Sequence, residues 1–360
     1  MEIHDPIIIN HRSFRKDELV GYSAKMRNDR SLASWERDLY SFIHDFLHPK
    51  TTLKQKTSGT TGDPKVFQLE RSAMLHSARM TLDYFQLKPG MSALLCLPVN
   101  YIAGKMMVVR ALLGGLKLVA VEPGSHPLEK IETDIDFAAM VPMQVFDSIN
   151  TAESFARIRT LIIGGGEISP ALLTRIKKLY NTRVYETFAM SETYSHFAVR
   201  RINGDSPDLY FQTLRGVKIG SDSRACLEVS VPGITNSPVQ SNDLVEIVSE
   251  GSFKWLGRID NRISSGGIKI IPELLEERLR EKVNSDLVMV GIPDEKLGQK
   301  LVLVIEAPIK DQLPPDLKEW MQSNLQKHEI PKEIVVLPKL PRNDSMKILR
   351  RKLISFLELR

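Results

Sequence analysis

Residues 56–66, KTSGTTGDPKV, carry the side chains whose types and spacing point most directly to chemistry. Glycines let a backbone approach a ligand closely, and hydroxyl and backbone N–H groups donate hydrogen bonds to anionic oxygens. Lys65 adds a mobile positive charge. The spacing is not that of a Walker P-loop, because Gly59 and Gly62 are close together and Lys65 follows a proline. A simple surface turn needs only the GDP, so the segment predicts a phosphate-binding loop.

Further segments follow this loop in order: YETFAMSET (185–193), SND (241–243), GRIDNRISSGGIKIIPELLE (257–276), GIPDEKLGQ (291–299) and LPRNDSMKILRRKL (340–353). Together they resemble the motifs of the adenylate-forming superfamily, which includes acyl-CoA synthetases, luciferases and the adenylation domains of peptide synthetases. The resemblance covers residues 57–353. It implies an α/β adenylate-forming fold with a large N-terminal domain, a small mobile α/β C-terminal domain, and the use of ATP, Mg²⁺ and CoA.

The resemblance also assigns nucleotide-binding roles to residues of this chain. Those that would cover the ATP phosphates are Thr57, Ser58, Gly59, Thr60, Thr61, Gly62 and Lys65. Those that would bind the rest of the nucleotide are Gly164, Gly165, Gly166 and Phe188 at adenine, Asp243 and Arg258 at the ribose, and Ser191 in the same set.

Catalysis in this superfamily is shared between two orientations of the small domain. By resemblance, Glu192 would hold Mg²⁺ against the phosphates, since a hard cation prefers oxygen ligands. Lys347 would contact the α-phosphate and the carboxylate during adenylation. Asp260 would be the hinge, and Gly266 and Gly267 would line the tunnel for the CoA thiol after rotation.

The chain departs from the family pattern at several positions. Ala189, Ser191 and Asn242 stand where Gly, Thr and Gly are usual, which are changes among small residues. Met346 precedes Lys347 where the family usually has Gly. Only 56 residues precede the phosphate loop, so an N-terminal subdomain is expected to be mostly missing.

A narrower resemblance indicates which carboxylic acid would be the substrate. VNYIAGKMMVVRALLGG, VPMQVFDSI, LIIGGGEIS and TFAMSETYSHFAVRRI look most like the o-succinylbenzoate–CoA ligases of menaquinone biosynthesis. Such an acid has a second carboxylate, which must not be buried unpaired. The candidate contacts are Tyr101, Lys105, Ser195 and His196, whereas Arg110 is interpreted as structural.

Bulk properties agree with a small-molecule enzyme. The net charge of +5 suits anionic small ligands and is too dispersed to indicate nucleic acid binding. Cys96 and Cys226 are far apart and lie in apolar runs, which predicts buried thiols and a reducing compartment. The first residues do not form a signal peptide, and no apolar run is long enough to span a membrane, so a cytoplasmic protein is expected.

Strand-like and helix-like runs alternate up to about residue 200, which predicts an α/β unit with a mostly parallel sheet. A helix is expected over 31–48 with Ser31 as a candidate cap. Short strands follow, and a second α/β pattern begins near residue 260. The predicted domains are residues 1–257 and 258–360.

Two other functions remain open at this point. One is an aryl- or fatty-acyl-CoA ligase of the same fold, which a long apolar tunnel would favour. The other is a non-catalytic binder of acyl nucleotides, which loss of Glu192 or Lys347 would favour. Both residues are present.

Overall fold

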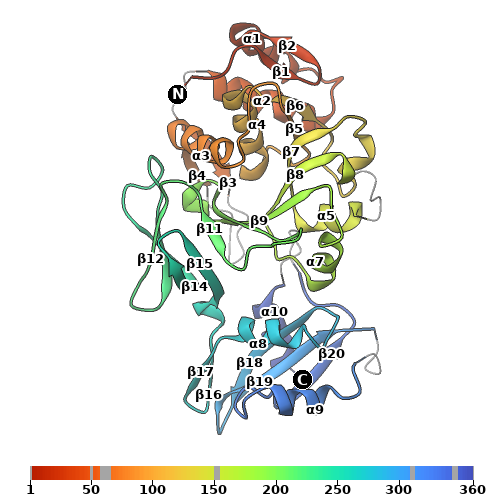
Figure 1. Cartoon of the computed structure of the whole chain (residues 1–360), viewed down its shortest axis with the longest axis vertical. Helices are drawn as coiled ribbons and strands as arrows, with labels where there is room; N and C mark the ends of the chain where they lie inside the picture. The colour runs from red at the N-terminus through yellow and green to blue at the C-terminus, as the bar shows by residue number, and fades with distance from the viewer. Residues whose placement is uncertain are drawn as a thin grey trace.

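The computed structural model describes residues 2–48, 52–56, 66–149, 155–308, 313–342 and 348–359. The predicted phosphate-loop residues Thr57–Lys65, and Lys347, lie outside the described residues. Figure 1 shows two bodies: a larger one, coloured red to green, and a smaller blue one at the C-terminal end.

The helices lie on both sides of a large sheet and on the smaller sheet. The α-helices are α1 (Lys16–Met26), α2 (Ser34–Leu47), α3 (Arg71–Tyr84), α4 (Ile102–Gly114), α5 (Pro142–Ser148), α7 (Pro170–Ile176), α8 (Pro272–Leu279), α9 (Leu317–Asn324) and α10 (Arg350–Glu358). Short 3-10 helices are η1 (Pro127–Lys130), η2 (Ser191–Thr193) and η3 (Ile259–Asn261).

The strands divide between a 13-stranded sheet, a two-stranded hairpin and a five-stranded sheet. The large sheet contains β1 (Ile7–Ile9), β2 (Arg12–Phe14), β5 (Ser92–Leu95), β6 (Lys117–Ala120), β7 (Ile135–Met140), β8 (Ile158–Ile163), β9 (Arg183–Ala189), β10 (His196–Arg201), β11 (Phe211–Thr213), β12 (Lys218–Ser221), β13 (Cys226–Ser230), β14 (Val239–Ser249) and β15 (Ser252–Arg258). The hairpin is β3 (Thr52–Lys56) and β4 (Val66–Glu70); the small sheet is β16 (Ile263–Ser265), β17 (Ile268–Ile270), β18 (Leu287–Asp294), β19 (Gly298–Glu306) and β20 (Glu333–Leu337).

The mostly parallel sheet predicted for the first 200 residues is confirmed, and the short strands that follow extend it with an antiparallel part. Its order is β12-β13-β14-β15-β11-β10-β9-β8-β7-β5-β6-β1-β2. Pairing is parallel from β1 through β6, β5, β7 and β8 to β9, and antiparallel from β9 through β10 to β12. Helices connect the parallel strands, while mostly short turns connect the antiparallel ones, as each geometry requires.

The parallel part of the sheet is covered on both faces. Successive residues of β5 alternate: Leu95 joins the core under α2 and α4, whereas Leu94 joins the core under α5 and α7. Ala138 and Ala139 of β7 divide in the same way. This period of two, with both faces apolar, explains why these strands are continuous hydrophobic runs in the sequence.

The helix expected over 31–48 is present as α2, but Ser31 is not its cap. The N-cap is Ala33, and the Ser31 hydroxyl instead donates to Asp29 at 2.6 Å. The buried face of α2 includes Ile43 and Phe46, both of which are inaccessible to solvent. This face packs into the same core as α4, so α2 covers the α4 side of the sheet.

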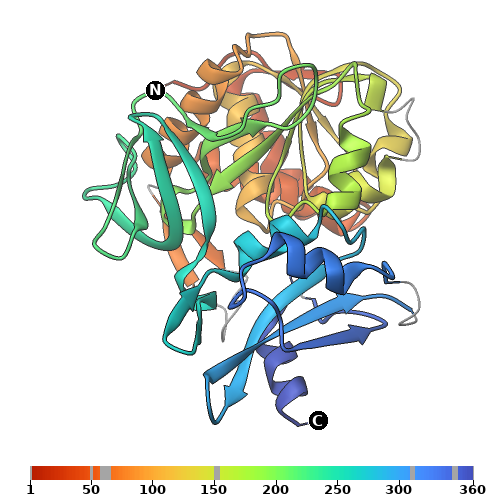
Figure 2. The same ribbon diagram turned by 60° about the horizontal axis from the view of Figure 1, so that its bottom comes forward.

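The change from the large to the small sheet falls between Arg258, which ends β15, and Ile263, which begins β16. We call the parts before and after this change the large domain and the small domain. The predicted boundary near residue 258 and the hinge at Asp260 remain predictions. Figure 2 shows α8 of the small domain close to the large domain. None of the helices in the described ranges combines the length and the apolarity needed to cross a bilayer.

Two glycines in helices provide a matched test of packing. A Cβ at Gly104 of α4 would lie less than 3 Å from backbone atoms of Leu97 and Pro98, whereas a Cβ at Gly21 of α1 would meet nothing within 4 Å. Gly104→Ala should therefore destabilise the protein by about 1–3 kcal/mol through overpacking. Gly21→Ala should stabilise it by about 0.5–1 kcal/mol, because alanine loses less backbone entropy in a helix. Urea denaturation measures both; equal effects would contradict this packing of α4.

Candidate active site

The predicted adenine segment follows β8, at the carboxyl end of the parallel strands. Gly164 lies against the neighbouring strand β9, because a Cβ there would collide with the Thr187 hydroxyl. That hydroxyl donates to the Ile163 carbonyl at 3.0 Å. Gly165 has a φ of +81°, which side chains rarely tolerate. A side chain at Gly164 would push this turn away from β9, whereas one at Gly165 would strain its backbone.

Phe188 lies near the end of β9, one residue beyond Thr187. Its ring packs edge-on against Phe197, Phe211 and Phe253 at centroid distances of 5.2–5.7 Å. The ring is only partly buried and is held in one orientation by this cluster. A rigid, half-exposed aromatic ring is a suitable stacking surface for a nucleotide base, so the predicted adenine contact fits the structure without being tested by it.

Glu192 lies in η2, immediately after β9. The Thr193 hydroxyl closes this turn, since it accepts from the Met190 N–H at 3.1 Å and donates to the Ser195 carbonyl at 2.8 Å. Glu192 and Ser191 are exposed. One exposed carboxylate fits Mg²⁺, which is commonly held by one or two carboxylates together with substrate phosphates. Among the described residues there is no cluster of three or more metal-ligating side chains, so the fit depends on phosphate oxygens.

The same turn is joined to the hairpin that flanks the phosphate loop. Tyr194 has a φ of +62°, and its hydroxyl accepts a hydrogen bond from the Glu70 N–H, at the end of β4, at 3.1 Å. In the hairpin, Lys56 pairs with Val66, so the segment between them begins and ends at adjacent strand positions. The loop's attachment points are therefore tied to the Glu192 turn.

The predicted ribose residues face each other across two strands. Asp243 of β14 is directly opposite Arg258 of β15. One Asp243 oxygen accepts from the Trp255 indole at 3.0 Å, and the other lies 3.5 Å from the Arg258 guanidinium. Fixed in this way, the carboxylate retains lone pairs that can accept from ribose hydroxyls.

Arg258 also contacts the predicted hinge residue, with 2.9 Å between its guanidinium and Asp260. The Asn242 amide donates to both Asp260 oxygens at 3.2 Å. Burial acts to raise the pKa of Asp260, but these two donors hold that pKa below its usual value. Asn242 is therefore more than a small replacement for Gly, because its side chain fixes the hinge carboxylate to the large domain.

Two of the predicted acid contacts, Ser195 and His196, meet a residue interpreted as structural. The Arg110 guanidinium of α4 donates to the Ser195 hydroxyl at 2.6 Å. The two nitrogens of the His196 ring lie 3.3 Å from the Thr81 hydroxyl and 3.4 Å from the Ser195 hydroxyl. Thr81 donates in turn to the Ser77 carbonyl, so a neutral His196 with its proton on Nε2 satisfies the whole network.

Arg110 is the unusual member of this group. Its side chain is 2% exposed, and no carboxylate pairs with it among the residues that the structure describes. Its Nε is buried without a hydrogen-bond partner in those same residues. Burial lowers the pKa of Arg110 to about 9. Since burial of an unpaired cation is costly, this position is suited to an anionic ligand.

The other two predicted acid contacts lie elsewhere on α4. Lys105 is buried, and its ammonium lies 5.9 Å from the centre of the Phe42 ring of α2. Burial lowers the pKa of Lys105. Tyr101, the N-cap of α4, is 55% exposed. Their roles as acid contacts remain predictions.

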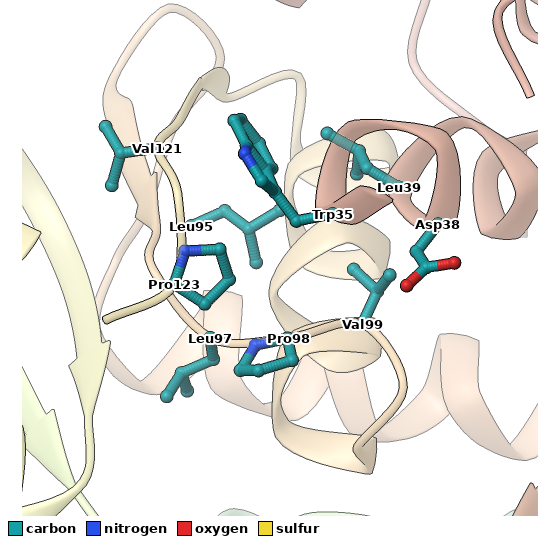
Figure 3. Close-up of a pocket in the computed structure, with 9 residues that line it drawn as sticks. All are labelled: Trp35, Asp38, Leu39, Leu95, Leu97, Pro98, Val99, Val121 and Pro123. Carbon is teal, nitrogen blue, oxygen red and sulfur yellow. The ribbon is translucent and has the colours of Figure 1, made fainter. Parts of the chain in front are cut away.

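A small cavity opens beside the ends of β5 and β6 (Figure 3). It encloses about 20 Å³, close to the space that one water molecule needs. Apart from Asp38 its lining is apolar, and Asp38 already accepts from Asn100 at 2.9 Å. Its lining residues are Trp35, Asp38, Leu39, Leu95, Leu97, Pro98, Val99, Val121 and Pro123. This cavity is too small for an aryl acid.

Gly266 and Gly267, predicted for the thiol tunnel, form the exposed turn between β16 and β17. Figure 1 shows these strands at the end of the small domain remote from the large domain. Both glycines have positive φ, which a tight two-residue hairpin turn requires. Their role, which needs a rotation of the small domain, remains a prediction.

Comparison with family models gives two matches. Residues 51–222 match the model described as AMP-binding enzyme. Residues 285–347 match the AMP-binding enzyme C-terminal domain.

Individual relatives agree with these matches. An acyl-CoA synthetase (AMP-forming)/AMP-acid ligase II-like protein from Dyadobacter fermentans is 35% identical, with a TM-score of 0.62; the match covers 94% of this chain and 98% of that chain. A 2-succinylbenzoate–CoA ligase of Listeria monocytogenes is 27% identical over 327 residues, which are 82% of this chain and 68% of that protein. The o-succinylbenzoate CoA synthetase of Bacillus subtilis, solved with an acyl-adenylate, has a TM-score of 0.72 at 18% identity. The match covers 98% of this chain and 95% of that chain. At this identity the likeness shows the fold alone.

The protonation state of the buried His196 can be tested through the pH dependence of the free energy of unfolding. Burial, and then the charge of Arg110, holds the pKa of His196 well below 6.5. The unfolded chain therefore binds a proton near pH 6.5 that the folded chain does not, and stability should fall as the pH drops below about 6.5, by up to about 1.4 kcal/mol per pH unit. His196→Gln should remove this contribution, as measured by urea denaturation between pH 5 and 7.5.

The exposed His126 provides the matched control. His126→Gln should keep the wild-type dependence of stability on pH. The assignment of His196 as a buried neutral ring would be wrong if His196→Gln left that dependence unchanged.

Proposed function

We propose that this chain, which belongs to the AMP-binding enzyme family, joins o-succinylbenzoate to CoA in menaquinone biosynthesis. As a family member it is an ATP-dependent acid–CoA ligase of the adenylate-forming type. The choice of acid is supported by relatives named 2-succinylbenzoate–CoA ligases, which are 25–27% identical to it.

The burial of Arg110 without a carboxylate partner among the described residues is the observation that most directly supports this choice of acid. An aryl acid with a second carboxylate would supply the anion that this guanidinium lacks among the described residues. Arginine suits this task, because its fork of donors matches a carboxylate in a bidentate arrangement. Ser195 and His196 then act as positioning residues that keep the guanidinium in place.

The proposed reaction has two steps. A carboxylate oxygen of the acid attacks the α-phosphorus of ATP, and pyrophosphate leaves. The CoA thiolate then attacks the acyl carbon, and AMP leaves. No enzyme nucleophile is needed, so catalysis consists of positioning and of stabilising charge at phosphorus.

The chain's own residues divide these tasks. Gly164, Gly165 and Phe188 would hold the adenine, while Asp243 and Arg258 would hold the ribose. Residues 57–65 would cover the phosphates. Bound Mg²⁺ would neutralise phosphate charge, and Glu192 would be its protein ligand. Lys347 would stabilise the charge that gathers between the carboxylate and the α-phosphate.

The alternatives are less well supported. A fatty acid has no second carboxylate to pair with the buried Arg110 guanidinium. A simple aryl acid would leave the Arg110 guanidinium buried without an anion. A non-catalytic nucleotide binder would have no need of Glu192 or Lys347, and the chain has both.

A pyrophosphate-release screen with ATP, Mg²⁺ and CoA tests this assignment. Wild-type enzyme should show its highest kcat/KM with o-succinylbenzoate, compared with benzoate and long-chain fatty acids. Arg110→Met should lower that kcat/KM by about 10²-fold or more, because loss of a buried charged partner costs about 2–5 kcal/mol. The KM for ATP should change little.

Lys105→Met is the matched comparison, since it removes the other buried cation of α4. A smaller loss with Lys105→Met than with Arg110→Met assigns the second carboxylate to Arg110. A wild-type preference for benzoate or a fatty acid would remove o-succinylbenzoate as the substrate.

Lys347→Ala should separate the two half-reactions. A cation at the α-phosphate stabilises the adenylation transition state more than the ground state, and its loss typically costs about 10²–10³ in rate. The variant should fail to form acyl-adenylate at a normal rate but should still convert supplied acyl-adenylate and CoA to thioester. Single-turnover kinetics measures each step. Equal slowing of both steps would mean that Lys347 does not act in adenylation alone.

A further inference from the structure

An ion pair joins the two domains at the edge of the candidate nucleotide site. Glu167 comes directly after the glycines that follow β8, in the large domain. Arg280 ends α8, in the small domain. Their side chains meet with 2.6 Å between Nη2 and Oε1. The Arg280 side chain is 23% exposed and the Glu167 side chain is 55% exposed, so water reaches the pair from the Glu167 side.

The pair marks one orientation of the small domain. Arg350, in the first turn of α10, is close enough to Glu167 for the two charges to interact. The face with the ends of α8 and the start of α10 therefore meets the large domain. The turn with Gly266 and Gly267 is exposed at the far end of the small domain (Figure 1). A rotation that brought this turn to the large domain would carry Arg280 away from Glu167.

The link between the domains is held on each side. Asn242 fixes Asp260 to the large domain. Asn261, the next residue, donates to Glu273 of α8 at 2.5 Å and is thereby fixed to the small domain. The contacts of the linker therefore change from the large domain to the small domain between Asp260 and Asn261.

We propose that the Glu167–Arg280 pair is a latch that holds the small domain in the orientation for adenylation and must open before the thioester step. This inference rests on the proposed two-step function. Glu167 is next to the predicted adenine turn, so the latch couples the nucleotide site to the position of the small domain. A partly exposed pair shifts such an equilibrium roughly two- to fivefold.

The test uses charge reversal and its rescue. Glu167→Arg and Arg280→Glu each turn the attraction into repulsion, and the double variant restores an attraction. Lys282→Glu is the matched control: Lys282 pairs with Asp316 at 2.6 Å wholly within the small domain, and it undergoes the same change of charge as Arg280→Glu. All variants are full-length chains.

Two readouts are measured. The first is resonance energy transfer, without substrates, between dyes on Asp205→Cys in the large domain and Lys318→Cys in the small domain. Both positions are exposed, and the native Cys96 and Cys226 are buried. The second is the ratio of the thioester rate to the adenylation rate in single turnovers.

Each single reversal should shift the distribution of energy-transfer efficiencies. It should also raise the ratio of the thioester rate to the adenylation rate roughly two- to fivefold. The double variant should return both readouts towards their wild-type values. Lys282→Glu should match wild type. Unchanged transfer in the single variants, or a double variant that does not recover, overturns the latch. If no acid is activated but the variants change energy transfer as described, the Glu167–Arg280 pair still controls domain orientation, and the proposed ligase function is wrong.

Discussion

The candidate site depends on the reversal of the chain between β9 and β10. β9 is the last strand of the parallel series, and β10 pairs with it in the opposite direction. The turn between them needs Tyr194 at a φ of +62°, a conformation that a bulky side chain keeps only when its surroundings hold it. The Tyr194 hydroxyl supplies such a hold at the end of β4. One short stretch therefore places the aromatic ring proposed for the base, the carboxylate proposed for the metal, and Ser195, which accepts from Arg110.

The arginine at the candidate site, Arg110, differs in its partners from two arginines of the small domain. In the small domain, Arg342 pairs with Asp286 and Glu306 at 2.6 Å, and Arg350 pairs with Glu276 at 2.7 Å. Burial acts to lower the pKa of Arg350, but Glu276, Glu273 and Glu167 raise it above its ordinary value. Arg110 donates to the Ser195 hydroxyl and contacts the Met107 thioether, its charge acts on the nearby His196 ring, and burial lowers its own pKa. These two arginines are neutralised within the fold, whereas Arg110 has no carboxylate partner among the described residues, and this difference is the basis for proposing it as the contact for the second carboxylate.

Sequence reasoning identified the family and the order of the strands along the chain, because these depend on local motifs and periodicity. It did not identify the direction of strand pairing beyond β9, since alternation of apolar residues is the same in both directions. The contact between Arg110 and Ser195 could not be predicted, because these residues are 85 positions apart in the sequence. Asn242 was interpreted as a small replacement because its contact with Asp260 depends on the register of β14 and β15. Residues 57–65 and Lys347 lie outside the described ranges, so their roles rest on resemblance.

The burial of both cysteine thiols bears on how the enzyme's acyl-adenylate intermediate would react. Cys96 is inaccessible to solvent and burial raises its pKa to about 12, while burial also raises the pKa of Cys226. An acyl-adenylate is a reactive acylating agent, and thiolates are the protein groups that it would modify fastest. With both thiols protonated and enclosed, the incoming CoA competes with no cysteine of the enzyme for the activated acyl group.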